Sequence, residues 1–204
     1  QDLEAGHGPV RCALCPSAAT STGMVLSVFM FLWRLFAWAW ISGVVIWPAM
    51  PPLSLASWLA RERGAASSLA FLTLIGYPMY LLLVAFLVVF SKWLLIGRYQ
   101  TGTLPVNSWA YLRWWSVDRL VVFVNELCFA AFRGGPLYFV YLRALGLRAA
   151  GYCRIDTRHI SEFDLITLGK CCVVAEGAKM RPATAEAGAL HLRPMAFGES
   201  CAVG

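Results

Sequence analysis

Two long apolar segments constrain the fold of this chain more than any other feature of its sequence. They cover residues 24–47 and 69–96. An α-helix rises about 1.5 Å per residue, so a helix of either length can cross the roughly 30 Å hydrocarbon layer of a bilayer. Only 14% of the 204 residues are charged, whereas a typical soluble domain carries about 25%. We therefore predict a transmembrane hairpin over residues 23–97, preceded by a polar tail over residues 1–22.

Prolines and one arginine interrupt the predicted hairpin. Pro48, Pro51 and Pro52 are expected to end the first helix, because proline lacks an amide hydrogen and its ring blocks continuation. Pro78 is expected to kink the second helix. Arg34 lies within the first span, where a charge costs about 2.5–3.5 kcal/mol on insertion scales. Its guanidinium should therefore face protein, reach a lipid headgroup or meet the acid of a partner.

Positive charge flanks the apolar segments. The net charge is +6, and the basic residues are most numerous after the second apolar segment. Anionic lipid headgroups are therefore the expected partners, and nucleic acid is not. By the positive-inside rule the C-terminal part and the N-terminal tail should lie on the cytoplasmic or equivalent side of the membrane. A bacterial plasma membrane and an organelle membrane, such as the thylakoid or mitochondrial inner membrane, both fit.

Residues 98–146 combine aromatic and basic side chains in a way that is typical of a membrane interface. We predict an interfacial amphipathic helix within residues 108–132. The alternative is a re-entrant helix, in which Glu126 would pair with Arg133 or Arg119. The residues expected to contact the membrane or a partner are Arg34, Trp93, Arg98, Trp109, Arg113, Trp114, Trp115 and Arg119.

The apolar pattern of residues 147–204 has a period of six. An apolar residue followed by a small one at this spacing is typical of hexapeptide repeats, each of which forms one face of a triangular coil. We therefore predict a short left-handed β-helix over residues 147–204, with an irregular pair of β-strands as the alternative. The apolar positions are Leu168, Val174, Met180, Phe197 and Val203.

Isolated reactive residues do not add up to a complete cofactor site, and we expect no metal and no cofactor. Cys12 and Cys15 form a lone C-x-x-C pair, which is a weak zinc candidate because a structural zinc site needs four ligands. The seven cysteines are odd in number and irregularly spaced, which argues against a disulfide framework. His159 lies near Glu162 and Asp164 in the sequence; we expect a surface turn at the corner of a coil, and a candidate acid–base pair is the alternative.

Several short motifs after the second apolar segment carry a family resemblance. They are GRY at residues 97–99, YLRWW at 111–115, YLRALG at 141–146 and ISEFDLITLG at 160–169. Together they resemble the C-terminal membrane region of non-ribosomal-peptide-synthetase-like proteins of the polylysine-synthetase type. The resemblance implies a left-handed β-helix next to membrane helices and a link to acyl or peptide transfer.

The chain departs from the pattern of this family where the family has a histidine. In an ungapped alignment of residues 177–198 that histidine falls on Ala183, and a basic residue of the family falls on Gly188. Glu186 and Pro194 match the family. Because alanine cannot accept a proton, the imidazole that would act as general base is absent.

The leading hypothesis is a non-catalytic, membrane-anchored accessory subunit of a larger membrane protein complex, derived from a synthetase-like transferase. The missing histidine, the absence of adenylation and carrier domains from these 204 residues and the few repeats favour it. The alternative is an amide-forming acyl or aminoacyl transferase, with His159 or His191 as base and Glu162 or Glu186 orienting it. A further alternative is a membrane module that binds lipid or pigment.

Overall fold

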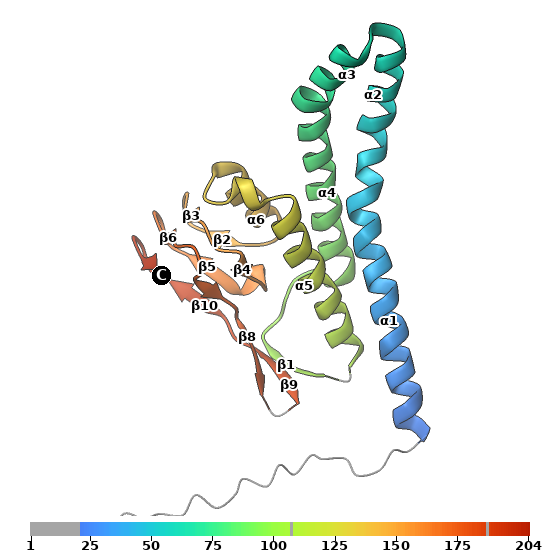
Figure 1. The fold of residues 1–204 in the computed structure, drawn as a ribbon. Coiled ribbons are helices and arrows are strands. Elements are labelled where there is room, and N and C mark those ends of the chain that lie inside the picture. The colour runs from blue at the N-terminus through green and yellow to red at the C-terminus, as the bar shows by residue number, and fades with distance from the viewer. Residues whose placement is uncertain (1–20, 107, 187) are drawn as a thin grey trace, which may run out of the picture.

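A computed structural model describes residues 21–106, 108–186 and 188–204 of the chain. The first 20 residues of the predicted polar tail, with Cys12 and Cys15, lie outside the described residues. The remainder forms two long helical arms that lie side by side, and shorter helices and small sheets pack against one flank of the arms (Figure 1).

The first arm consists of α1 (Ser21–Ile46), the 3-10 turn η1 (Trp47–Ala49) and α2 (Met50–Arg63). The three elements follow one another as one rod (Figure 1). The expectation that the prolines end this helix is therefore wrong. The residues that flank the 3-10 turn keep right-handed helical backbone angles. The prolines occupy the first positions of the turn and of α2, where the helix needs no amide hydrogen bond and a fixed φ is favourable.

The second arm consists of α3 (Ala65–Phe71), the π-helical turn η2 (Leu72–Gly76) and α4 (Tyr77–Leu95). Gly64, with a φ of +88°, reverses the chain between the arms, and glycine tolerates this left-handed conformation without steric cost. The irregularity expected at Pro78 takes the form of the wider π turn immediately before it, because proline cannot donate the regular backbone hydrogen bond.

Both arms are long and apolar enough to cross a membrane by length and composition. The qualifying stretches are Ser27–Arg63, with 37 residues, and Ala65–Leu95, with 31 residues. About 20 residues suffice to span the hydrocarbon layer. Either arm therefore exceeds the required length by several helical turns, and those turns can pack against the rest of the protein.

Two helices connect the arms to the strands. α5 (Trp109–Leu127) packs against α1 and α4, and Ser108 caps it by accepting a hydrogen bond from the backbone N–H of Tyr111. After the 3-10 turn η3 (Ala130–Phe132), α6 (Pro136–Ala144) packs against β3 of the strand region. Glu126 forms an ion pair with Arg133 at 3.1 Å, one of the two arginines that the alternative of a re-entrant helix paired with it.

Short parallel strands form three ladders in the described part of the chain. Arg148 pairs with Thr167, and Arg154 with Val173, in each case 19 positions further along the chain. The first ladder contains β2 (Arg148–Ala149), β5 (Ile166–Leu168) and β10 (Met195–Phe197), the second β3 (Arg154–Ile155), β6 (Val173–Val174) and β11 (Ala202–Val203), and the third β4 (His159–Ile160) and β7 (Lys179–Met180).

The six-residue pattern locates the apolar positions of these ladders. Leu168, Val174 and Met180 each end a strand and are buried, and Phe197 and Val203 occupy the corresponding places in β10 and β11, where they are half-buried. Phe197 is directly opposite Leu168, and Val203 is opposite Val174. The apolar residue of each six-residue unit therefore stacks on the one above it.

An antiparallel hairpin separates β7 from β10. β8 (Ala183–Glu186) and β9 (Ala189–Leu192) pair with each other, and β1 (Gly102–Pro105) adds to the free edge of β9. Figure 1 shows this sheet extending away from the ladders. The hairpin lengthens the connection between β5 and β10, so that Thr167 pairs with Ala196.

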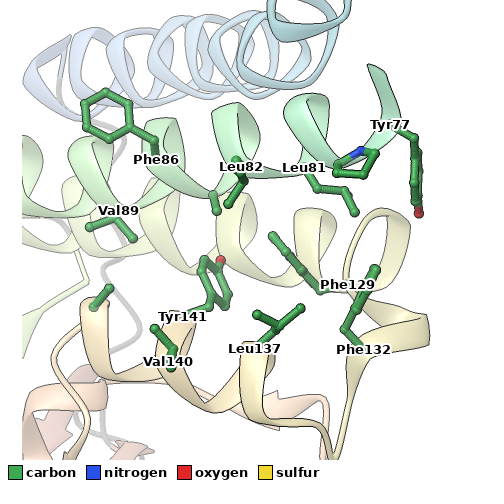
Figure 2. Close-up of a pocket in the computed structure, with 13 residues that line it drawn as sticks. Tyr77, Leu81, Leu82, Phe86, Val89, Phe129, Phe132, Leu137, Val140 and Tyr141 are labelled. Atoms are coloured by element: carbon green, nitrogen blue, oxygen red, sulfur yellow. The ribbon is translucent and has the colours of Figure 1, made fainter. Parts of the chain in front are cut away.

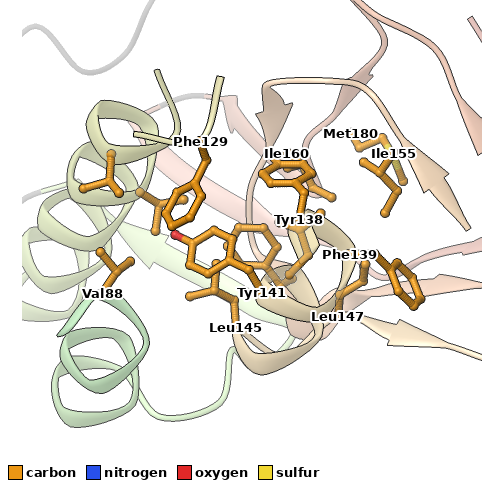
Figure 3. Close-up of a cluster of buried hydrophobic side chains, with 14 of the residues drawn as sticks. Val88, Phe129, Tyr138, Phe139, Tyr141, Leu145, Leu147, Ile155, Ile160 and Met180 are labelled. Carbon is orange, nitrogen blue, oxygen red and sulfur yellow. The ribbon is translucent and has the colours of Figure 1, made fainter. Parts of the chain in front are cut away.

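One cluster of buried apolar side chains joins the helices to the ladders (Figure 3). Val88 enters it from α4, Tyr138 from α6, and Ile160 and Met180 from the third ladder. The core therefore does not end at the boundary between the helical arms and the strands, and the two parts pack as one unit.

Candidate functional site

A buried ion pair connects the second arm to the turn before β5. Lys92 Nζ lies 2.6 Å from Asp164 Oδ2, and the two side chains are 0% and 6% exposed. The same Oδ2 accepts a hydrogen bond from the backbone N–H of Tyr99 at 3.2 Å. Lys92 Nζ also lies 4.0 Å from the ring centroid of Trp93, which is within cation–π distance. Asp164 therefore binds the C-terminal end of α4 through Lys92 and the segment that follows α4 through the amide of Tyr99.

Glu162 is the second acid of this turn. Its backbone is left-handed, with φ 47° and ψ 53°, which is uncommon for a residue other than glycine. Its side chain accepts hydrogen bonds from Trp114 Nε1 at 2.7 Å and from Ser161 Oγ at 2.6 Å. Burial raises the pKa of this carboxyl group, although the two hydrogen bonds and the nearby Arg181 act in the opposite direction.

Asp118 on α5 extends the network to β7. Its Oδ1 lies 3.1 Å from a terminal guanidinium nitrogen of Arg181, and its Oδ2 lies 2.8 Å from Arg119. Arg181 Nε also donates to Ser161 Oγ at 3.3 Å. Two sets of polar contacts therefore tie α4 and α5 to the strand region, one between Lys92 and Asp164 and one that runs from Trp114 through Glu162, Ser161 and Arg181 to Asp118. We call the two sets together the acidic clamp, and it comprises Lys92, Trp114, Asp118, Ser161, Glu162, Asp164 and Arg181.

Solvent has little access to the inner part of the acidic clamp. The cavity next to Glu162 has a volume of about 10 Å³, about the minimum that one water molecule requires. Glu162 itself is 1% exposed, so the expectation of a surface turn at this position is wrong. A carboxyl group that is buried in this way and bonded to two donors can link α5 to the turn, but it is not accessible to a substrate.

A second, larger and polar cavity lies next to Asp164. Its volume is about 480 Å³, and Gln100, Arg148, Thr167 and Pro194 contribute to its walls. This volume falls within the usual range for small-molecule sites. The cavity has a cationic and an anionic side chain in its walls, so a small polar molecule fits it better than an apolar one.

The four residues proposed for catalysis do not come together. His159 lies in β4, where its Nε2 accepts a hydrogen bond from Arg158 Nε at 3.2 Å. His191 lies in β9 between Thr103 and Thr184 of the neighbouring strands. Glu186 is exposed at the end of β8, whereas Glu162 is buried in the acidic clamp. No hydrogen bond or ion pair links any two of the four among the described residues.

Ala183, on which the histidine of the family falls, has an apolar environment. It pairs with Leu192 in the hairpin and packs against a small cluster that contains Trp114, Leu165 and Leu190. The methyl group of alanine suits this position, whereas an imidazole would bring polar nitrogens to it. No group of three or more His, Cys, Asp or Glu side chains in the described part of the chain has the arrangement of a metal site.

Several of the predicted membrane or partner contact residues also touch other parts of the same chain. The guanidinium of Arg34 lies 5.6 Å from the ring centroid of Trp115, and the residue is otherwise exposed. Trp109 packs edge-on against Trp33 at 4.4 Å. Trp93 Nε1 donates to the carbonyl oxygen of Ala144 at 3.0 Å.

Two of the other predicted contact residues belong to the acidic clamp or bind it. Trp114 belongs to it, and Arg119 pairs with its Asp118. Arg113 is half-buried on α5, and Arg98 is exposed after the end of α4.

Five residues of the clamp were not among the predicted site residues, namely Lys92, Asp118, Ser161, Asp164 and Arg181. Lys92 had a recognisable signal, since a lysine near the end of an apolar helix needs either a headgroup or a buried acid. Its partner is 72 positions away, and no local spacing rule identifies it. Arg181 and Ser161 carry no sequence signal, because their roles depend on how β7 and the turn stack.

Comparison with known proteins gives one partial similarity. Over 88 residues the chain is 35% identical to a delta-poly-L-ornithine synthetase from Acinetobacter baumannii (strain AB307-0294). The aligned part represents 41% of this chain and 6% of that protein. No family model matches the chain, and no solved structure matches it.

Proposed function

We propose that this chain is a non-catalytic, membrane-anchored accessory module of a larger membrane protein complex, derived from a synthetase-like transferase. One observation carries the proposal. The acids in the motif of the resemblance are buried partners of the membrane-spanning arm and of α5, and Glu162 in particular is 1% exposed. The carboxyl groups of the motif therefore serve to join the helices to the ladders.

The proposed architecture places both arms in the membrane and a short left-handed β-helix on the cytoplasmic or equivalent side. The three parallel ladders support the β-helix, because a triangular coil has three faces and each ladder would be one of them. The 19-residue spacing of paired positions is close to three units of six. The partial similarity to a synthetase supports descent from this class of enzyme.

Native purification from source membranes in a mild detergent tests the accessory role. Mass spectrometry of all comigrating proteins should reveal the same large complex in independent preparations. A protein that migrates alone as a stable monomer would overturn the proposal. The orientation has its own test, since Cys171 is exposed on the ladder side. In sealed vesicles of known orientation a membrane-impermeable maleimide should label it only from the cytoplasmic side.

An amide-forming aminoacyl transferase is the second candidate, and the partial similarity to a poly-ornithine synthetase favours it. His159 and His191 are its only described histidines that can serve as general base. Transfer from a carrier-bound aminoacyl thioester should then disappear in His159→Ala or His191→Ala. Transfer that survives in both variants would remove these two residues as bases, and a wild-type chain without transfer activity would favour the accessory role.

A further inference from the structure

Four cysteines gather in the strand region of the molecule. They are Cys153, Cys171, Cys172 and Cys201, and all four are free thiols. The apolar groove of about 610 Å³ between α4 and α6 differs in this respect, because no cysteine is among the described residues that line it (Figure 2). Thiols can be oxidised and can bond to one another, so their arrangement decides whether the strand region holds a reactive site.

Three of these cysteines stack on one another along the second ladder. Cys153, Cys172 and Cys201 directly precede β3, β6 and β11, which pair in register. The backbone N–H of Arg154 donates to the carbonyl oxygen of Cys172 at 3.0 Å. In the same way the backbone N–H of Val173 donates to the carbonyl oxygen of Cys201 at 2.9 Å. We call this stack the thiol column, and it comprises Cys153, Cys172 and Cys201.

The side chains of the thiol column occupy equivalent positions. The Sγ atom of Cys153 lies 3.2 Å from the carbonyl oxygen of Gly169. The Sγ atom of Cys172 lies 3.1 Å from the carbonyl oxygen of Gly198. A Cβ atom built on Gly198 would lie 3.7 Å from Cys201 Sγ. The sulfur atoms of Cys172 and Cys201 therefore approach the same glycine from neighbouring strands.

Neighbours in the thiol column are within reach of a disulfide bond. Hydrogen-bonded strands lie about 4.7–4.9 Å apart, and a disulfide joins residues whose Cα atoms are about 4.4–6.8 Å apart. The Cβ atoms must come to about 3.5–4.5 Å, so one strand has to move slightly towards the other. Of the described strands in this ladder, β11 lies at the edge and β6 lies between β3 and β11. The strand that follows Cys201 is therefore freer to move than the strand that follows Cys172.

Solvent reaches the thiol column at Cys201. Cys153 and Cys172 are each 1% exposed, whereas Cys201 is half-buried. Burial raises the pKa of the Cys153 thiol, which lowers its fraction of reactive thiolate. An oxidant from solution therefore meets Cys201 first, and Cys172 is the thiol next to it.

From this geometry we propose that Cys201 and Cys172 form a reversible disulfide when a peroxide oxidises the protein. The thiolate of Cys201 attacks one oxygen of hydrogen peroxide, the O–O bond breaks, and a sulfenic acid and hydroxide result. The thiol of Cys172 then attacks the Cys201 sulfur and displaces its oxygen as water, so that the S–S bond forms. In total two thiols lose two electrons and two protons, and hydrogen peroxide accepts them and becomes two water molecules.

The disulfide would fasten β11 to β6 by a covalent bond. Where cellular reductants keep thiols reduced, such a bond is transient and reports the presence of an oxidant. The inference depends on contacts within the strand region alone. It therefore holds or fails independently of the accessory role and of the membrane placement.

Peptide mapping of the full chain in detergent micelles tests this proposal. The reduced protein is treated with hydrogen peroxide, the remaining thiols are blocked with N-ethylmaleimide, and the tryptic peptides are identified by mass spectrometry. We expect the peptide that contains Cys172 to be linked to the peptide that contains Cys201. Dithiothreitol should separate the two peptides again, because the bond is a disulfide.

Cys171→Ser is the matched control, because Cys171 is exposed and directly precedes Cys172. Serine suits this position, since Ser200 directly precedes Cys201 and has the same φ of +54° as Cys171. The Cys171→Ser variant should form the link as the wild type does. A link that disappears in this variant would assign the bond to Cys171 and overturn the proposal.

Two further variants, made in the Cys171→Ser background, separate the roles of the two thiols. Cys201→Ser should slow the loss of the Cys172 thiol about tenfold or more, because a buried thiol reacts poorly with an oxidant from solution. Cys172→Ala should let Cys201 proceed to the sulfinic acid, because no neighbouring thiol traps the sulfenic acid. Oxidation of Cys201 to the sulfinic acid while Cys172 remains a free thiol in the wild type would overturn the proposal. So would a link from Cys172 to Cys153 in place of Cys201.

Discussion

The turn at residues 162–164 and the hairpin formed by β8 and β9 both carry residues that the family resemblance singles out, yet their surroundings differ. In the turn, the side chains of Glu162 and Asp164 are buried, and they bind Trp114 of α5 and Lys92 of α4. In the hairpin, Glu186 is exposed and Ala183 packs against a small hydrophobic cluster. A carboxyl group in the turn should therefore affect stability more than one in the hairpin, because burial strengthens electrostatic interactions and makes an unpaired charge costly.

The difference supports the proposed non-catalytic role. A buried acid whose partners come from α4 and α5 is required for packing. An exposed acid on a hairpin can change at little cost to stability. Under the proposed accessory role, the two acids of the turn serve packing, and Ala183 has no part in a reaction.

Asp164→Asn should have the largest effect on stability. The substitution leaves the ammonium group of Lys92 buried without its counter-charge, and removal of one partner of a buried ion pair costs about 3–5 kcal/mol. Denaturant unfolding in detergent micelles measures the loss. Glu186→Gln in the hairpin is the matched control and should change the free energy of unfolding by less than about 0.5 kcal/mol.

A double variant shows whether the loss comes from the unpaired lysine. Lys92→Met combined with Asp164→Asn should recover at least half of the stability lost in Asp164→Asn, because no charge is then left unpaired. If Asp164→Asn alone remained within about 0.5 kcal/mol of the wild type, the acidic clamp would contribute no more to stability than the hairpin.

Gly146→Ala and Gly188→Ala extend the comparison to the backbone. Both glycines have positive φ, +115° and +78°, so both substitutions carry a similar conformational cost of about 1 kcal/mol. At Gly146 the added methyl group would also collide with Asp164 Oδ1, whereas at Gly188 it would meet open space. We expect Gly146→Ala to be less stable than Gly188→Ala by about 1–3 kcal/mol, the usual cost of overpacking. Thermal unfolding in micelles would show the difference, and equal melting temperatures would contradict a tight fit at the clamp.

Glu162→Gln should have a smaller, pH-dependent effect. The folded pKa of Glu162 lies above its usual value of 4.5, mainly because of burial. Below that usual value the carboxyl group is protonated in both the folded and the unfolded state. As the pH rises towards the folded pKa, the unfolded state releases its proton first, so the contribution of Glu162 to stability decreases. The stability of the wild type relative to Glu162→Gln should therefore fall with rising pH over this window. A relative stability that increases with pH would show that the ionised carboxylate is the favoured form.

Sequence patterns predicted those parts of the fold that depend on local periodicity. The two apolar stretches became the two arms, and Leu168, Val174 and Met180 became the buried positions of the ladders. The prolines were misjudged because their effect depends on whether they fall inside a helix or in its first turn. The acidic clamp was missed for a different reason. It pairs residues such as Lys92 and Asp164 that only the completed packing brings together.

The smallest expected effect concerns His191. Its strand lies in the exposed hairpin sheet, where it pairs with Thr103 and Thr184, and its side chain is half-buried. His191→Ala should therefore change the free energy of unfolding by no more than about 0.5 kcal/mol, roughly a tenth of the Asp164→Asn effect. Micelle unfolding and co-purification of the complex are the two measurements, and both should match the wild type. A large loss of stability would show that the hairpin is as tightly integrated as the acidic clamp. Loss of the complex at unchanged stability would instead identify the hairpin as the surface that contacts the partner.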